Sequence, residues 1–433
     1  MVKSDISVRD IRLSQAVCAS QDGTANISHQ QRTMIYLDNN ATTAVAPEVR
    51  DAMRPYFENL YFNPSSAYQV ATDVAKQVEA ARATIARHIG AAHASEILFT
   101  SCATESNNHV FAGVIKANPN RRHIITTVVE HPAVLEVCKD LQRSGYEVTW
   151  LGVDRSGQLN MREYVQALRP DTLLVSIMHA NNETGVVFPV ARLARIAKET
   201  NPNILFHTDA TQSITKLSIN LSGEMRGVDF VSFSGHKLHA PKGIGGLYIR
   251  RGTPCRTFLI GGHQESGRRG GTENVPYIIG MARAFELAEE THKEDVARMA
   301  NLRDKLQQGI LERIPHIEIN GATAERMPNT LSITCISIEG EGLLFALNHT
   351  DICASSGSAC TSATLEPSHV LKAMHPFLAN FASLRFSLSR YTTEAEIDTV
   401  LEKLPVSIAN LRRLSPYWDQ AANAPHNDVN LIQ

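Results

Sequence analysis

The sequence predicts an α/β protein with a large domain built around a mostly parallel sheet and a smaller C-terminal α/β domain. Short β-rich runs alternate with amphipathic helical stretches from residue 34 to about residue 275, as in repeated β-α-β units whose sheet is covered on both faces. After that point the alternation gives way to a long helical segment. The chain has 433 residues, more than one compact core usually holds, so two domains are expected.

Strands are predicted from runs rich in β-branched and aromatic residues: 35–37, 97–100, 123–129, 146–153, 172–179, 204–209, 230–234 and 246–250. Amphipathic helices separate these runs. In one of them apolar residues recur at helical spacing from Val74 to Ile89, and Gly90 follows as a stop signal. Such alternation brings the carboxyl ends of successive strands to one edge of the sheet.

The C-terminal part of the chain has a different pattern. We expect a helix from Val275 to about Ile314, a strand at 329–335, a helix at 341–347 and a strand at 384–389. The last helix begins with the capping box Thr393-Glu-Ala-Glu396. These elements predict the second, smaller domain, and the polar residues after Leu414 are expected to be frayed.

Composition excludes several classes of function. Lys and Arg total 42 and Asp and Glu total 44, so the charges nearly balance. The composition therefore lacks the excess of positive charge that is typical of nucleic-acid-binding proteins. No run approaches the ~18 apolar residues of a membrane span. The first 33 residues fit neither a secretory signal nor a transit peptide. Seven scattered cysteines, with no CxxC pair and no zinc-type spacing, indicate reduced thiols in a cytoplasmic protein without a metal site.

Lys237 is the first candidate for chemistry. It lies in the segment Ser234–Gly243, directly after the predicted strand 230–234. A lysine at this edge of a sheet can be partly desolvated and can lose its proton, as a Schiff-base lysine must. A single lysine would more often be a solvated loop residue, so this position alone is a weak indication.

Two other strand ends strengthen the indication. Asp209 ends the predicted strand 204–209, where a carboxylate can keep a pyridinium nitrogen protonated, although an isolated Asp there would usually cap a helix. The strand 97–100 runs into a helix through small polar residues, where free N–H groups and the Thr104 hydroxyl can cradle a phosphate. An amine, a carboxylate and a phosphate cradle together meet the needs of pyridoxal 5'-phosphate.

A series of ordered motifs between about Met34 and Arg413 carries a resemblance to a known family. They are Tyr36–Thr43, Asn63–Ser66, Ala103–Ser106, Glu130–His131, Asn181–Gly185, Asp209 with Gln212, Ser234–Lys237, Arg269–Asn274, Ser355–Ser362 and Leu384–Ser387. On these motifs the chain resembles the cysteine desulfurases of the class V aminotransferase group, in the branch associated with iron–sulfur clusters and nitrogenase. The resemblance implies the fold type I of pyridoxal-phosphate-dependent transferases.

The resemblance implies a catalytic role for three residues. Lys237 would be the Schiff-base lysine, and His131 would stack on the cofactor ring and help to move protons. The Cys360 thiolate would attack the sulfur of L-cysteine, keep it as a persulfide and release L-alanine. The surroundings of Cys360 are small, polar and glycine-bearing, which favours an exposed loop over a packed core. The sulfur would pass to an iron–sulfur scaffold or another acceptor protein.

Further roles follow from the same resemblance. Asp209 would pair with the ring nitrogen, and Asn182 and Gln212 would contact the ring oxygen. Arg385 would clamp the substrate carboxylate with its bidentate fork, with Asn182 also near the substrate. The remaining cofactor-binding residues, which include the predicted phosphate ligands, are Ala103, Thr104, Ser234, Gly235, His236 and, from the neighbouring subunit of a homodimer, Thr272.

Pattern and resemblance together divide the chain into four parts: a loosely ordered extension at 1–33, a large cofactor-binding domain at 46–292, a small domain at 34–45 with 293–415, and a polar tail at 416–433. The sequence departs from the family pattern at Cys102 and Ala240, where Gly is frequent, and at Tyr68, where His is frequent.

Two alternative functions stay open. One is another reaction on the same fold, such as selenocysteine lysis or transamination. The other is a catalytically silent scaffold.

Overall fold

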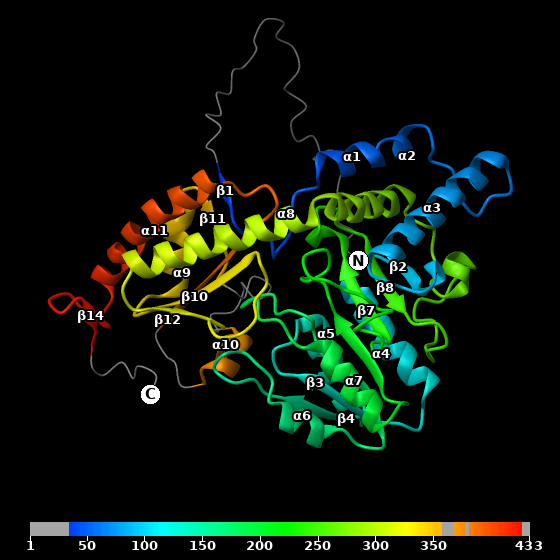
Figure 1. The fold of residues 1–433 in the computed structure, drawn as a ribbon, viewed down its shortest axis with the longest axis horizontal. Helices are drawn as coiled ribbons and strands as arrows, with labels where there is room; N and C mark the ends of the chain where they lie inside the picture. The colour runs from blue at the N-terminus through cyan, green and yellow to red at the C-terminus, as the bar shows by residue number, and fades with distance from the viewer. Residues whose placement is uncertain (1–33, 357–367, 377–380, 427–433) are drawn as a thin grey trace, which may run out of the picture. The chain divides into compact units, whose positions relative to one another are not determined.

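The computed structural model describes residues 34–356, 368–376 and 381–426 (Figure 1). The predicted loosely ordered extension, residues 1–33, lies outside these ranges. The described residues from Ile35 onward form one compact unit.

Among the described residues, seven strands form the central sheet, in the order β2-β8-β7-β6-β5-β3-β4. Their bounds are β2 Ile97–Thr100, β3 His123–Thr127, β4 Glu147–Leu151, β5 Thr172–Ser176, β6 Leu205–Asp209, β7 Phe230–Ser234 and β8 Gly245–Ile249. The strands β4, β3, β5, β6 and β7 are mutually parallel, and β8 runs antiparallel to both of its neighbours. The mostly parallel sheet predicted from the sequence is confirmed.

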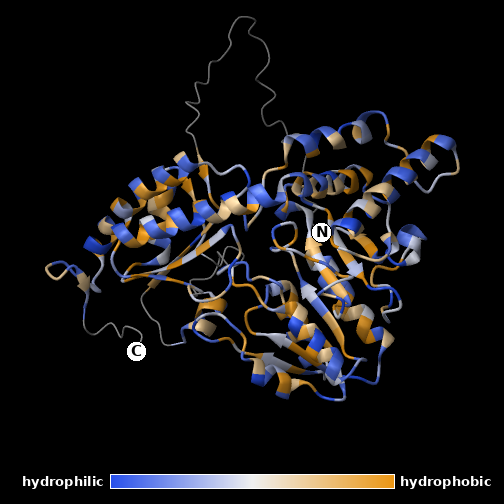
Figure 2. Ribbon diagram, viewed as in Figure 1, coloured by the Kyte–Doolittle hydropathy of each residue, from blue (hydrophilic) through white to orange (hydrophobic). Residues whose placement is uncertain are grey.

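Helices cover both faces of this sheet, which is why β3, β5, β6 and β7 are buried at every residue. Alternate strand residues belong to two apolar clusters, as the pleat requires: Phe206 and Val231 lie in one, and Leu205 and Phe230 in the other. The first cluster includes side chains of α3 (Gln69–His88), α7 (Val190–Thr200) and α8 (Val275–Arg313), and the second those of α4 (Ala103–Ala117) and α5 (Pro132–Arg143). Figure 2 shows the strands as the apolar centre of this arrangement.

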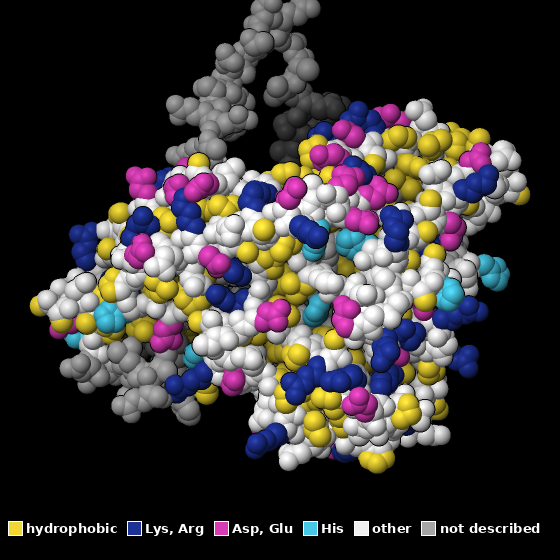
Figure 3. All heavy atoms as spheres, viewed as in Figure 1, with side chains coloured by type: hydrophobic (Ala, Val, Ile, Leu, Met, Phe, Trp, Pro, Cys, Tyr) yellow, Lys and Arg dark blue, Asp and Glu magenta, His cyan; other side chains and the backbone are white. Residues whose placement is uncertain are grey.

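Shorter elements complete the first part of the chain. They are α1 (Pro47–Met53), α2 (Pro55–Glu58), α6 (Met161–Ala167) and the 3₁₀ turns η1 (Ala94–Glu96), η2 (Gly235–Lys237) and η3 (Gln264–Gly267). On the face drawn in Figure 3, acidic and basic side chains of the described residues are interspersed. That face therefore offers no extended field of one sign.

The C-terminal elements surround a third apolar cluster. A three-stranded antiparallel sheet has the order β12-β10-β9, with β9 at Ile317–Ile319, β10 at Thr330–Ile336 and β12 at Phe381–Ser387. The helices α9 (Gly340–Asn348) and α11 (Glu394–Leu414) pack on this cluster, and β1 (Ile35–Tyr36) pairs in parallel with β11 (Ile352–Cys353). The short helix α10 (His369–Met374) instead packs its apolar side chains into the first cluster. The predicted capping box is present at the start of α11. The domain boundaries at 46 and 293 stay a prediction.

Part of the tail is folded. Trp418–Asp419 (β13) pairs with Ala424–Pro425 (β14), and Trp418 is only 5% exposed. The guanidinium carbon of Arg412 lies 4.1 Å from the centre of the Trp418 ring, which is a cation–π contact. The prediction of a frayed tail after Leu414 is therefore wrong for this hairpin, because the indole is buried against α11.

Asn40 connects the N-terminal segment to the rest of the unit. Its backbone N–H donates to Ser387 Oγ at 2.9 Å, and its Nδ2 donates to Thr330 Oγ1 at 2.9 Å and to the Asn182 carbonyl at 3.2 Å. Its Oδ1 accepts from Asn329 Nδ2 at 3.1 Å. Asn40 is 4% exposed, so these bonds are made away from water. They join β10, β12 and the loop after β5 at one point.

We expect Asn40→Ala to lower the free energy of unfolding by about 2–4 kcal/mol, because it leaves buried polar groups of Asn329 and Thr330 without this partner. Urea denaturation would measure the change. The control is Asn348→Ala, which replaces an exposed asparagine at the end of α9 and should change stability by less than about 0.5 kcal/mol. Equal changes for both variants would contradict the role of Asn40.

Candidate active site

A cavity of about 440 Å³ lies at the carboxyl ends of the parallel strands. Ser234 and Asp209 reach it from the ends of β7 and β6, and His131 reaches it from the chain after β3. Asn40 and Arg385 complete the wall from the elements of the third cluster. This position is where open α/β sheets bind their ligands, so the fold places the predicted residues around one space.

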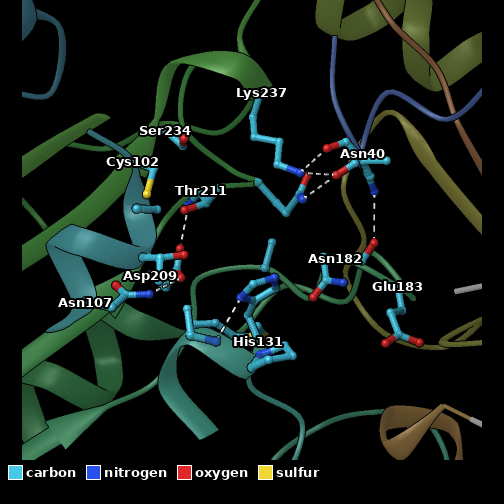
Figure 4. Close-up of a pocket in the computed structure, with 18 of the residues that line it drawn as sticks. Asn40, Cys102, Asn107, His131, Asn182, Glu183, Asp209, Thr211, Ser234 and Lys237 are labelled. Carbon is cyan, nitrogen blue, oxygen red and sulfur yellow. Dashed lines mark hydrogen bonds between the residues drawn. The ribbon is translucent and has the colours of Figure 1, made fainter. Parts of the chain in front are cut away.

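Lys237 points into this cavity from the end of η2. Its Nζ donates to the Ala41 carbonyl at 2.8 Å and also to the Asn40 carbonyl. The Asn40 carbonyl accepts a second bond from Gln212 Nε2 at 3.1 Å. In Figure 4 Lys237 extends toward Asn40, while Asp209, His131 and Asn182 line other sides of the space. The amine is thus held at the centre of the site by the turn that contains Asn40.

Asp209 is fixed by two N–H donors. Its Oδ2 accepts from Asn107 Nδ2 at 2.8 Å, and its Oδ1 accepts from the Thr211 backbone N–H at 2.9 Å. The residue is 6% exposed. A carboxylate with both oxygens bound in this way has one defined orientation toward the cavity.

His131 caps α5 with its ring. Its Nδ1 accepts from the Ala133 backbone N–H at 3.1 Å, so in the neutral ring the proton is on Nε2. Burial lowers the pKa of His131, and the charge of Asp209 opposes that shift. The ring therefore lies in the cavity as a neutral imidazole whose free nitrogen is a donor.

Several buried polar atoms around the cavity have no hydrogen-bond partner among the described residues. They include Ser234 Oγ and Gln212 Oε1. A buried polar atom without a partner costs about 1–3 kcal/mol. Ala103 and Thr104 also line the cavity at the start of α4, where the first N–H groups have no intrahelical acceptor. These atoms indicate a ligand that supplies both acceptors and donors.

His236 lies next to the same group of atoms. Its Nδ1 is 3.1 Å from Thr42 Oγ1, and burial lowers the pKa of His236 to about 4, with the charges of Lys237 and Lys242 acting in the same direction. The ring is therefore neutral near pH 7 and can bind a ligand by a hydrogen bond. A neutral ring adds no charge to the binding of an anionic ligand.

Arg385 is a buried arginine, with only 2% of the residue exposed. Its Nη2 pairs with Asp38 Oδ1 at 2.7 Å, and its Nη1 donates to the Asn182 carbonyl at 2.9 Å. Its Nε has no partner among the described residues. The group is thus oriented by Asp38 and still has a donor to offer.

Two buried glutamates stand beside the site. Burial raises the pKa of Glu130 to about 8 and that of Glu183 to about 7. Glu130 Oε1 accepts from Thr127 Oγ1 and from the Met178 N–H, both at 2.9 Å, and Glu183 accepts from the Ser368 hydroxyl. Glu130 therefore holds two neighbouring segments together as a largely neutral group.

Three predicted residues are not among those that line the cavity. Cys360 lies outside the described residues. Thr272 is exposed in the segment between η3 and α8. Gly235 uses its N–H on the Ile244 carbonyl at 2.9 Å, and a Cβ on it would lie 2.8 Å from Ile244 Cγ2. Glycine is required there by packing.

The three departures from the family pattern have separate surroundings. Cys102 lines the cavity as the N-cap of α4, with an extended φ of −173°. Tyr68 is 53% exposed and packs edge-on against Phe62. Ala240 is buried, and its N–H donates to the Gly235 carbonyl at 3.1 Å. Of the three, only Cys102 is placed to touch a ligand in the cavity.

Sequence reasoning gave no role to several residues that shape the site: Asn40, Asn107, Thr211, Glu183 and His369. Asn107 had a usable signal, because it lies one helical turn after the predicted phosphate residues at the start of α4. His369 had none. Its Nε2 contacts the Glu130 carbonyl at 3.0 Å across 239 positions of sequence.

Among the described residues, none of the helices combines the length and the apolar character that a membrane span needs. No group of three potential metal-binding side chains occurs in the same ranges.

The comparisons with known proteins agree with one another. The family model described as aminotransferase class-V matches residues 35–400. Cysteine desulfurase 2 of Trichormus variabilis is 52% identical over 392 residues, which are 90% of this chain and 97% of that protein. Cysteine desulfurase NifS of Azotobacter vinelandii is 49% identical over 395 residues, 91% of this chain and 97% of that protein.

A solved structure of a NifS-like protein superimposes with a TM-score of 0.81 at 39% identity, and covers 87% of this chain and 100% of that chain. The chain belongs to the aminotransferase class-V family and, within it, to the cysteine desulfurases, which depend on pyridoxal 5'-phosphate.

Proposed function

We propose that the cavity binds pyridoxal 5'-phosphate and that the chain takes the sulfur of L-cysteine onto Cys360. In this reaction the C–S bond of the substrate breaks, an S–S bond forms on Cys360, and L-alanine leaves. The observation that carries the proposal is the convergence of the Lys237 amine, the Asp209 carboxylate and unpartnered buried groups on one cavity. The other reactions on the same fold gain no support from the relatives.

The residues present fit the cofactor. An aldehyde needs an amine, which Lys237 offers, and a pyridine nitrogen needs a carboxylate, which Asp209 offers. The phosphate needs donors, which the first N–H groups of α4 and the hydroxyls of Thr104 and Ser234 supply. When bound, the cofactor would supply a protonated ring that accepts the electrons released at the α-carbon.

The chain's own groups then handle the protons. Lys237 Nζ would hold the aldehyde before the reaction and take the α-proton of the substrate during it. His131 Nε2 carries the proton of the neutral ring, so it can give that proton to a leaving group and accept one from a thiol only afterwards. Arg385, oriented by Asp38, would bind the substrate carboxylate.

Gln212 imposes one condition on this arrangement. Its Nε2 is bound to the Asn40 carbonyl, so its amide presents an oxygen to the cavity. The predicted contact with the ring oxygen therefore needs either a proton on that oxygen or a rotated amide. Asn182 lines the same cavity, and its side chain can provide the alternative donor.

The acceptor of the sulfur is the finer part of the proposal. One relative bears the name cysteine desulfurase NifS, which supports delivery to an iron–sulfur scaffold that serves nitrogen fixation. A homodimer in which Thr272 of one subunit reaches the phosphate of the other, and a cytoplasmic location, stay predictions. Thr272 is exposed, as a contact with a second subunit requires.

We expect Cys360→Ser to reduce alanine formation from L-cysteine by at least about a thousand-fold, because the hydroxyl is a poor nucleophile for sulfur. The absorbance of the bound cofactor should stay. Cys353→Ser is the control, since Cys353 lies in β11 and does not line the cavity. If Cys360→Ser still forms alanine and sulfide at the original rate, the chain carries out a different reaction of this fold.

We expect Lys237→Ala to abolish the covalent attachment of the cofactor. After borohydride reduction, peptide mass mapping of the unaltered protein should find the cofactor on the peptide that contains Lys237. The control is Lys242→Ala, an exposed lysine in the same loop, which should keep both the colour and the adduct. An unaltered protein that stays colourless in the presence of pyridoxal 5'-phosphate would support the silent scaffold.

We expect Arg385→Lys to raise the KM for L-cysteine about 10- to 100-fold, which corresponds to the loss of one charge-assisted hydrogen bond. The lysine keeps the charge and loses the fork. Arg390→Lys serves as the control, because Arg390 pairs with Asp295 outside this cavity and should leave KM within about two-fold. Steady-state kinetics would measure both. An unchanged KM in Arg385→Lys would rule out the carboxylate clamp.

A further inference from the structure

Lys216 links the two strand ends that carry the site. Its Nζ donates to the Gln212 carbonyl at 3.1 Å and to the Lys237 carbonyl at 3.0 Å. Gln212 follows β6 and Lys237 follows β7, and these two strands are parallel neighbours in the sheet. One side chain therefore spans the backbone of the segment that holds Asp209 and the backbone of the segment that holds the reactive amine.

The turn before Lys216 is strained in a way that supports this link. Thr215 has a φ of 63°, a left-handed conformation that β-branched residues rarely adopt. Its carbonyl accepts from His292 Nδ1 at 3.1 Å, which ties the turn to α8. Such strain persists only where surrounding contacts require it. Lys216 follows this turn directly in the chain.

The amine of Lys216 sits in an enclosed, polar setting. The residue as a whole is half-buried, and it lines a second cavity of about 50 Å³ together with Lys237 and His239. Burial lowers the pKa of Lys216 to about 7, and the charge of Lys237 adds to this shift. In either protonation state, two N–H groups of the amine have a carbonyl acceptor here.

From these contacts we infer that Lys216 is a positioning residue for Lys237. It fixes the carbonyl of Lys237 to that of Gln212, and thereby sets where the reactive amine lies relative to Asp209. The inference rests on the proposed function, since it assigns to Lys216 a part in the same site. Lys216 itself is not among the residues that line the larger cavity.

The test replaces Lys216 by Met, which keeps the length of the stem and removes both donors. We expect Lys216→Met to bind pyridoxal 5'-phosphate, to lower kcat about 10- to 100-fold and to leave the KM for L-cysteine within about three-fold, because a small misplacement of a reacting group slows chemistry more than binding. The visible circular dichroism of the bound cofactor should change. Lys216→Arg, which keeps two donors, should recover most of kcat.

The matched control is Lys198→Met. Lys198 also donates inward, to the Ile204 carbonyl at 2.7 Å and to Asp229 at 2.6 Å, but at the opposite end of β6. Its loss should lower stability and leave kcat and the circular dichroism unchanged. If Lys216→Met does not fold, Lys216→Gln, whose shorter amide cannot reach both carbonyls, gives the same comparison.

The outcomes separate the two claims. If Lys216→Met holds the cofactor with unchanged kcat and an unchanged dichroism spectrum, the positioning role is overturned and the proposed function stands. If the unaltered protein binds no cofactor, the proposed function fails and the inference fails with it. A slow Lys216→Met that Lys216→Arg restores supports the positioning role, since a purely structural loss would be shared by Lys198→Met.

Discussion

The carbonyl oxygen of Asn40 is the point on which the site depends. It accepts bonds from Lys237 Nζ and from Gln212 Nε2, while the side chain of Asn40 is bound to Asn329 and Thr330. The chain near its N-terminal strand therefore meets the ends of two strands of the large sheet and the start of β10 in one buried turn. Without that turn the amine would have no fixed position relative to the other elements.

Burial determines which groups in and around the cavity carry charge. It raises the pKa of Glu130 to about 8 and lowers the pKa of both His179 and His236 to about 4. These three are therefore mainly neutral near pH 7. Both oxygens of Asp209 accept an N–H, so its carboxyl group has a fixed orientation in the site. A ligand with a cationic ring and an anionic group then has one favourable orientation in the cavity.

Much of the fold could be predicted from the sequence, because each strand of the sheet is a local run of β-forming residues. The predicted ends of the strands were less accurate: the predicted strand 172–179 stops at Ser176, and Met178 and Ala180 beyond it line the cavity. The pairing of β1 with β11 joins positions more than 300 apart and leaves no local signal. The hairpin at Trp418 was missed for a similar reason, because its order comes from contact with Arg412 and not from its own pattern.

The candidate site divides in the same way. Lys237, Asp209 and Thr104 could be proposed because each stands where a strand ends, and strand ends of a parallel sheet meet. Most of their partners could not. Asn107 had only the signal of its helical spacing, and its contact with Asp209 spans 102 positions. Lys216 reaches Lys237 across 21 positions, through a turn that no residue pattern predicts. Residues expected to contact the ligand could be recognised by their place in sequence motifs. Residues that only position them are found from the folded structure.

The cap at the start of α5 has a consequence for the ring that provides it. Because a main-chain amide occupies one nitrogen of His131, the other is the sole exchange point between that ring and the contents of the cavity. In other proteins a carboxylate side chain often selects the tautomer, and a substitution can remove it. Here the Ala133 backbone N–H selects it, so substitution of neighbouring side chains leaves the proton of the neutral ring on the same nitrogen.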